Sequence, residues 1–236
     1  MVQIITDPKI LNPAPSLRIR FRKTGALQYI SHLDLVRTLT KVLIRSGIPL
    51  WYSEGFNPHP RISFATPMSI GLQSLYELVD VKIDRAVNTE AVKEALNRNL
   101  TEECRVEEVY LPETRFTDIR FSSYVIEIVT AGASAFLAEA LANSLTTPPV
   151  VVLKRSKSGE KETDISPMIR TIAASYADGV IRLDALLRVD SEAFLNPEYL
   201  ITYMKEKRGI LAGSQIEERY SILRTGVYDA EGHLFR

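Results

Sequence analysis

Residues 17–65 read LRIRFRKTGALQYISHLDLVRTLTKVLIRSGIPLWYSEGFNPHPRISFA, and this stretch decides the fold of the first half of the chain. Apolar and basic side chains alternate over residues 17–22, which predicts a strand with one apolar and one basic face. A helix follows, because Ser31 and Asp34 form a capping-box-like start, apolar residues recur at helical spacing from Leu35 to Leu43, and Gly47 ends the pattern.

The remaining patterns predict the same order of elements twice. In the first half we expect short strands over 50–52 and 62–64, strands over 75–83 and 105–111, and a helix over 89–100. The second half predicts strands over 124–129, 180–189 and 219–225, helices over 133–145 and 197–207, and a hairpin arm from 150 to 165 that turns at 157–159. The expected fold is therefore α+β, with tandem ferredoxin-like (β-α-β-β-α-β) two-layer sandwiches. Its parts are an extended N-terminal arm over 1–16, a first domain over 17–115 and a second over 116–236.

Composition excludes several classes of function. The 236 residues carry 29 Lys and Arg against 29 Asp and Glu, so no bulk charge attracts nucleic acid or an anionic membrane. Cys104 is the single cysteine, which rules out an intrachain disulfide and any cysteine-held iron–sulfur cluster within one chain. No apolar run approaches the ~20 residues that a membrane helix needs. We expect a soluble cytoplasmic protein with no membrane partner, and the absence of metal and cofactor motifs predicts no cofactor and no metal site.

Local charge is less even than the total. Residues 17–61 contain eight Lys or Arg against Asp34 and Glu54, whereas residues 75–113 contain ten acids against five bases. If two helices cover the apolar face of the first strand, its arginines lie on the open face, where their planar forks suit phosphate recognition. The alternative is that they pair with acids of the second domain or are only solvated. The predicted RNA- or partner-binding set is Arg18, Arg20, Arg22, Lys23, Arg37, Lys41, His59 and Arg61.

The loop GFNPHPR, residues 55–61, is the second candidate feature. Pro58 and Pro60 restrict the backbone on both sides of His59, so the imidazole is presented at little entropic cost. Such a loop suits phosphate contact or acid–base work, although a turn that only shapes the chain explains it as well. His32 and His59 together are the candidate catalytic pair of a metal-independent endoribonuclease, provided that the fold brings them together.

Two long motifs carry a family resemblance. FRKTGALQYISHLDL (residues 21–35) and SEGFNPHPRISFATP (residues 53–67), with GEKETDISPMI (residues 159–169), resemble the radical SAM-linked proteins of unknown function. Those proteins are encoded beside, or fused to, cobalamin-binding radical SAM proteins. The chain differs from the family pattern at Asn57, where a second histidine is expected. The resemblance implies an accessory role beside a radical SAM partner, and no reaction.

Three hypotheses follow for the function. The first is a non-catalytic accessory protein that binds RNA or an RNA-like substrate through the basic sheet face, for a radical SAM enzyme. The second is a protein–protein adaptor that docks the radical SAM subunit without nucleic acid. The third is the endoribonuclease that uses His32 and His59. The sequence favours the first by a small margin.

Overall fold

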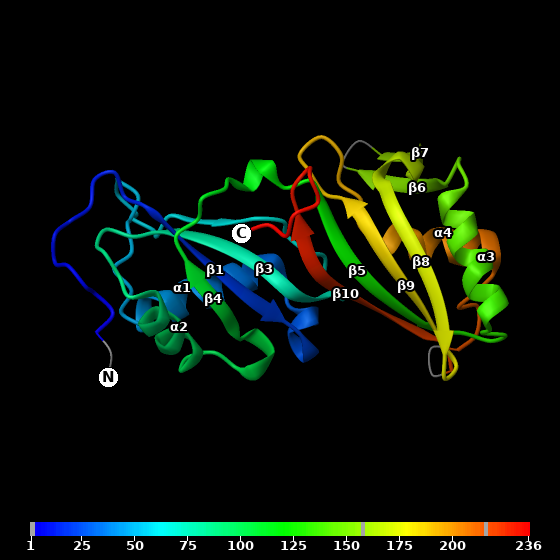
Figure 1. Ribbon diagram of the computed structural model, residues 1–236, viewed down its shortest axis with the longest axis horizontal. Helices are drawn as coiled ribbons and strands as arrows, with labels where there is room; N and C mark the ends of the chain where they lie inside the picture. The colour runs from blue at the N-terminus through cyan, green and yellow to red at the C-terminus, as the bar shows by residue number, and fades with distance from the viewer. Residues whose placement is uncertain (1–2, 157–158, 215–216) are drawn as a thin grey trace. The chain divides into compact units, whose positions relative to one another are not determined.

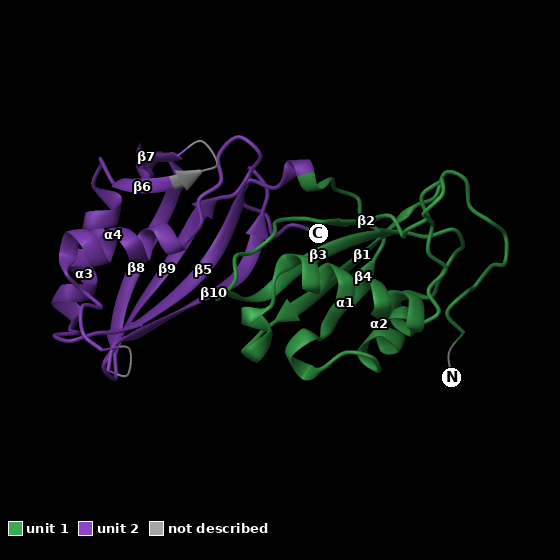
Figure 2. Ribbon diagram, turned by 180° about the vertical axis from the view of Figure 1, so that it is seen from behind, with its two compact units in different colours: residues 1–116, 236 green, residues 117–235 purple. Residues whose placement is uncertain are grey.

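The computed structural model describes residues 3–156, 159–214 and 217–236. The chain divides into two compact units, residues 1–116 with Arg236, and residues 117–235 (Figure 2). Each unit combines an antiparallel sheet with two α-helices, so the predicted α+β class is confirmed. None of the helices in the described ranges is long and apolar enough to cross a membrane.

The sheet of unit 1 is built around β1 (Ser16–Lys23) (Figure 1). This strand runs antiparallel to β4 (Val106–Tyr110) on one side and to β3 (Gln73–Lys82) on the other, and β2 (Ile62–Phe64) pairs with β3. Because side chains alternate along a strand, the apolar positions of β1 face the helices and its arginines face the other way. The core of unit 1 joins Leu17, Ile19 and Phe21 to buried side chains of both helices.

The two helices of unit 1 begin at capping residues. Before α1 (His32–Arg45), the Ser31 hydroxyl accepts a hydrogen bond from the Asp34 amide at 3.1 Å and donates one to the Asp34 carboxylate at 2.7 Å. Before α2 (Thr89–Asn97), the Asn88 side chain accepts from the Ala91 amide at 3.0 Å. Helix α1 thus starts where the sequence predicts, whereas α2 ends three residues before Leu100, the last residue of the predicted helix.

In unit 2 the strand order is β10-β5-β9-β8, all antiparallel. The strands are β5 (Phe121–Val129), β8 (Ile169–Ala177), β9 (Val180–Arg188) and β10 (Arg219–Tyr228), and the helices are α3 (Ala135–Thr146) and α4 (Glu198–Arg208). A separate hairpin pairs β6 (Val151–Ser156) with β7 (Gly159–Asp164). The predicted turn residues 157–158 lie outside the described residues.

Several local predictions need correction. Residues 50–52 form no strand; Leu50 and Tyr52 make isolated bridges to Ile83 and Pro60. Strand β8 was not predicted at all. Short 3-10 helices, also not predicted, lie at Gly25–Tyr29, Glu102–Cys104, Phe116–Asp118 and Ser166–Met168.

Candidate functional site

Arg18 is buried and is already paired, which corrects the expectation that it lies on an open face. Its Nε and Nη2 donate to the two carboxylate oxygens of Asp80 at 2.7 and 2.8 Å, and its Nη1 donates to the Thr114 hydroxyl at 2.8 Å. The guanidinium also stacks 4.4 Å from the centre of the Phe116 ring. Its side chain has no exposed surface, so it cannot reach an external ligand.

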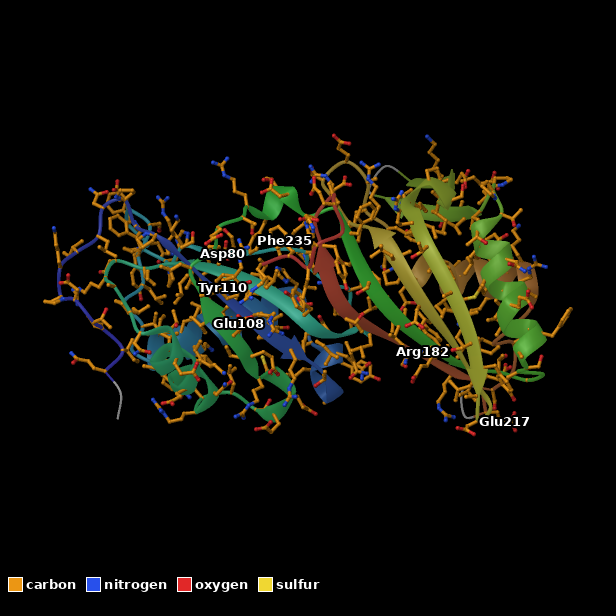
Figure 3. The ribbon with its side chains drawn as sticks, viewed as in Figure 1. Asp80, Glu108, Tyr110, Arg182, Glu217 and Phe235 are labelled. Carbon is orange, nitrogen blue, oxygen red and sulfur yellow. The ribbon has the colours of Figure 1, made fainter. Side chains whose placement is uncertain are left out.

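Arg20 and Arg22 are half-buried and also lie beside acids of unit 1. The register places Arg20 directly opposite Glu108 of β4, and their side chains pair at 3.4 Å. Arg22 donates to the Glu102 carboxylate at 2.9 Å and lies 3.8 Å from Glu107. Figure 3 labels Asp80, Glu108 and Tyr110 on this face. The acid-rich segment 75–113 therefore neutralises the basic face that the sequence predicts.

Lys23 is buried as well, with 3% of its surface exposed. It lies near Cys104, whose thiol pKa is raised to about 11, first by burial and then by the charge of Glu77, while Lys23 acts in the opposite direction. A thiol with a raised pKa is a poor nucleophile at neutral pH. The predicted role of Lys23 at a surface is thus corrected: its side chain belongs to the interior of unit 1.

Cationic side chains that do reach solvent lie on α1. Arg37, Lys41 and Arg45 are four residues apart, so they follow one another along the outer face of the helix, opposite the buried Leu35, Leu39 and Leu43. Arg37 makes a 3.5 Å contact with Asp34, and both side chains are more than half exposed. In the described part of the chain no ion pair engages Lys41 or Arg45. We call these three residues the α1 basic stripe.

Two apolar side chains accompany the α1 basic stripe. Leu33 is 55% exposed and Ile44 is 51% exposed on the same outer face. Single exposed apolar residues are common on proteins, but two beside three cations on one helix give a mixed apolar and basic surface. Arg45 and both apolar residues were absent from the predicted set, although the helical spacing of this stretch was sufficient to place all three on the outer face.

The loop that carries His59 is closed at its base. Tyr52 bridges Pro60, and the Ser53 amide donates to the His59 carbonyl at 2.8 Å. The Ser53 hydroxyl accepts from the His59 amide at 3.1 Å and lies 3.0 Å from Nδ1 of the imidazole. His59 and Arg61 are exposed, and Phe56 at the tip is fully exposed. The loop therefore presents an aromatic ring and an imidazole on a constrained backbone.

The two candidate catalytic histidines are not joined by any contact among the described residues. The His32 ring is half-buried and lies edge-on to Phe64, with ring centres 5.0 Å apart. This contact gives His32 a packing role at the start of α1. The hydrogen bonds of His59 stay within its own loop, to Ser53 and Asn57. Their joint role in acid–base cleavage of RNA therefore stays a prediction.

Unit 2 contains two further polar features. A hollow of about 510 Å³ is lined by residues that include Thr130, Leu137 and Arg208. Glu218 also lines it. The Glu218 carboxylate accepts from the Thr130 hydroxyl at 2.5 Å and from the Ala131 amide at 2.7 Å, which together with the Gly213 amide hold its pKa below the usual range. This carboxylate joins the loop after β5 to the segment before β10.

Asp229, Glu231 and His233 form the second feature, with their potential ligand atoms within 4.8 Å of one another. None of these three residues was in a predicted site. Asp229 accepts from the His233 amide at 2.8 Å, an interaction that closes the turn between these residues. The turn itself thus explains why these three side chains lie close together.

Comparison with known proteins gives a family but no activity. The family model described as "Uncharacterized protein conserved in bacteria (DUF2344)" matches residues 16–197. No curated protein matches the chain. The family description contains no reference to radical SAM proteins, so that link stays a prediction.

Solved structures give only distant likenesses. A chain of the "Cbf5-Nop10-Gar1 Complex" has 12% identity and a TM-score of 0.49, with 95% of this chain and 57% of that chain covered. A chain of the "archaeal box H/ACA sRNP Nop10-Cbf5 complex" has 10% identity and a TM-score of 0.45, with coverage of 94% and 55%. An unknown protein from Galdieria sulphuraria has 8% identity and a TM-score of 0.26, with coverage of 89% and 98%. The chain spans little more than half of the first two, and at these scores none carries an argument.

Proposed function

Because the chain belongs to the DUF2344 family of conserved bacterial proteins, which is described as uncharacterized, its function has to be inferred from its own surface, and we propose a non-catalytic accessory protein that binds RNA or an RNA-like substrate. The α1 basic stripe carries this proposal. It is the part of the predicted basic set, with Arg45 added, that is exposed along one helix, whereas Arg18 and Lys23 are buried.

Phosphate recognition suits this arrangement. Cations one helical turn apart are about 6 Å from each other, close to the spacing of successive phosphates in a nucleic-acid strand. The exposed Phe56 supplies a ring on which an unpaired base stacks. The resemblance of residues 21–35 and 53–67 to radical SAM-linked proteins supports a radical SAM enzyme as the partner that acts on the bound substrate.

For the fold, we propose that both units are ferredoxin-like. The order β4-β1-β3-β2 in unit 1 and the order β10-β5-β9-β8 in unit 2 are each obtained from a β-α-β-β-α-β chain whose strands are all antiparallel. In unit 2 the β6–β7 hairpin is then an insertion between α3 and β8. The likeness rests on strand order and direction alone.

Replacement of the α1 basic stripe is expected to weaken RNA binding about tenfold at moderate salt. In Arg37→Gln/Lys41→Gln/Arg45→Gln, three phosphate contacts are lost, so the slope of log affinity against log salt should fall by about two. An electrophoretic shift of total bacterial RNA across a salt series measures both effects.

The matched control carries Lys205→Gln/Lys207→Gln/Arg208→Gln, which removes three exposed cations from the last turn of α4. It should bind RNA as the unaltered protein does. Equal weakening in both variants would mean that only net charge matters, and unchanged binding in the α1 variant would remove the proposal.

A second candidate function is a protein–protein adaptor, favoured by Leu33 and Ile44 beside the α1 basic stripe. Interfaces between proteins combine apolar side chains with arginine more often than the rest of the surface does. Here the same helix face would dock an acidic and apolar surface of the radical SAM subunit, without nucleic acid.

Leu33→Ser/Ile44→Ser separates the two functions. If the protein is an adaptor, this variant should lose co-purification with the co-expressed radical SAM protein, also after nuclease treatment, while its RNA binding and its melting temperature stay unchanged. Phe136→Ser on α3 is the control, since Phe136 is 83% exposed on the other unit. Retention of the partner by the double variant would argue against the adaptor.

A further inference from the structure

Strand β8 is an open edge of the sheet in unit 2. It pairs with β9 along its whole length on one side, and in the described ranges no strand pairs with its other side (Figure 1). The amide and carbonyl groups of alternate residues on that outer side therefore have no ladder partner. Most of its residues are exposed, including Thr171, Ala173 and Ser175.

Edges in unit 1 are protected in ways that β8 is not. Strand β4 has only 5 residues and carries Glu107 and Glu108, and β2 has 3 residues. Short length and charge are devices that prevent a sheet edge from pairing with another chain. Strand β8 has 9 residues, IRTIAASYA, with no proline, and its single charged residue, Arg170, lies at an irregularity in the pairing with β9.

We propose that β8 pairs antiparallel with β8 of a second copy of this chain, across a two-fold axis at Ala173. This inference is independent of the proposed RNA-binding function. Ala173 is the midpoint of the strand, so full overlap places residue 173 opposite its own counterpart. The sheet of one copy then continues into the sheet of the other, with both α3 helices on the same side.

The sequence of β8 is complementary to itself in this register. Thr171 lies opposite Ser175, a pair that hydrogen bonds across strands, and Ile172 lies opposite Ala174. No like charges meet in the regular part of this register, because Arg170, at the irregularity, is the single charged residue of the strand. Because each of these pairs occurs twice about the axis, a second copy is a better match than an unrelated strand.

The side chains nearest to the axis are small. On the face of the sheet that carries Ala173, the neighbouring residue of β9 is Asp184, whose carboxylate is bound by Arg182 at 2.9 Å on its own strand. The charges nearest to the axis are thus satisfied within one copy. A side chain added at position 173 would meet its own counterpart first.

Substitution at Ala173 tests the pairing directly. The full chain should sediment as a dimer, and Ala173→Glu should be a monomer because two carboxylates meet at the axis beside Asp184. An equimolar mixture of the Ala173→Glu and Ala173→Lys variants should form dimers again, since opposite charges then meet. Ser191→Lys, at an exposed turn of unit 2, is the control and should stay dimeric.

A chemical cross-link provides a second, independent measurement. Residues opposite each other in an antiparallel pair have Cα atoms about 4.5–5.5 Å apart, which a disulfide can span, so Ala173→Cys should cross-link on oxidation. A monomeric unaltered chain, a dimeric Ala173→Glu variant, or a mixture that stays monomeric would each overturn the proposal. Failure of the cysteine variant to cross-link would overturn the register.

Discussion

Asp80→Ala is expected to destabilise unit 1 by about 3–5 kcal/mol, the usual cost of leaving one partner of a buried ion pair alone. The Asp80 carboxylate accepts two hydrogen bonds from Arg18, at 2.7 and 2.8 Å, and the Arg18 side chain is fully buried. Without the carboxylate, the guanidinium keeps its bond to Thr114 but loses the two charge-assisted hydrogen bonds from Asp80 that stabilise its buried charge.

Urea denaturation followed by the fluorescence of Trp51, the single tryptophan of the chain, measures this loss in unit 1. Glu108→Ala is the matched control. Glu108 pairs with Arg20, which is on the same strand as Arg18, and with the exposed Arg236, and both of its ion pairs are partly exposed. We expect a loss of about 1 kcal/mol or less in the control. Similar losses in both variants would show that burial does not distinguish the two pairs.

This result bears on how RNA binding is tested. A variant with alanine at Arg18, Arg20 and Arg22 removes the buried cation together with two paired ones, so it leaves Asp80 without its partner. Loss of RNA binding in that variant would report unfolding of unit 1 rather than loss of a contact. The α1 basic stripe is the better target because its three side chains are exposed and outside the core.

Elements with strong local signals were predicted well from the sequence. The alternation over 17–22 and the Ser31 cap placed β1 and α1 to within two residues of their observed bounds. In these segments the local preference and the tertiary environment agree, since the apolar positions are the ones that the core buries.

Strand β8 was missed for a physical reason. An edge strand buries only part of one face, so IRTIAASYA shows neither a clean alternation nor an apolar run. Residues 50–52 were predicted to be a strand because their local pattern is strong, but the fold around them does not allow one. Leu50 and Trp51 are apolar enough for a strand, but the Pro-containing loop that follows returns to Tyr52 within a few residues and leaves room only for isolated bridges.

The candidate site was predicted only in part, because the pairing of charges depends on strand order. The excess of acids in 75–113 was visible in the sequence. That Asp80 and Glu108 lie directly opposite Arg18 and Arg20 follows only once β3 and β4 flank β1. Helix spacing, in contrast, is local, and it placed Arg37 and Lys41 on the same face of α1 without knowledge of the fold.

Asp190→Asn is expected to destabilise unit 2 by about 2–3 kcal/mol at neutral pH, because it weakens several charge-assisted hydrogen bonds at once. The Asp190 side chain is 3% exposed and pairs with Nε of Arg188 at 2.5 Å. It also accepts from the amides of Glu192 and Ala193 at 2.8 and 2.9 Å. Asparagine fits the space but carries no charge for the guanidinium.

The pH dependence of this loss follows from the pKa of Asp190. Burial opposes its ionisation, but Arg188 and the two backbone amides outweigh burial, so its pKa in the folded chain is below the usual range. A lowered pKa stabilises the fold fully above the unfolded value, about 3.9, and this contribution disappears as the pH falls through the folded pKa. The difference between Asp190→Asn and the unaltered chain should therefore shrink below about pH 4.

Hydrogen exchange measures the stability of unit 2 when only peptides from unit 2 are analysed, so unfolding of unit 1 does not affect the result. The exchange is measured in pH steps from neutral to acid. Asp184→Asn is the control, since Asp184 also pairs with an arginine two residues away but is half exposed. It should change the stability little at any pH. If the loss in Asp190→Asn were the same at every pH, its cause would be the packing of the amide. A loss that fades in acid assigns the stability to the buried carboxylate, and with it the anchoring of the turn that follows β9.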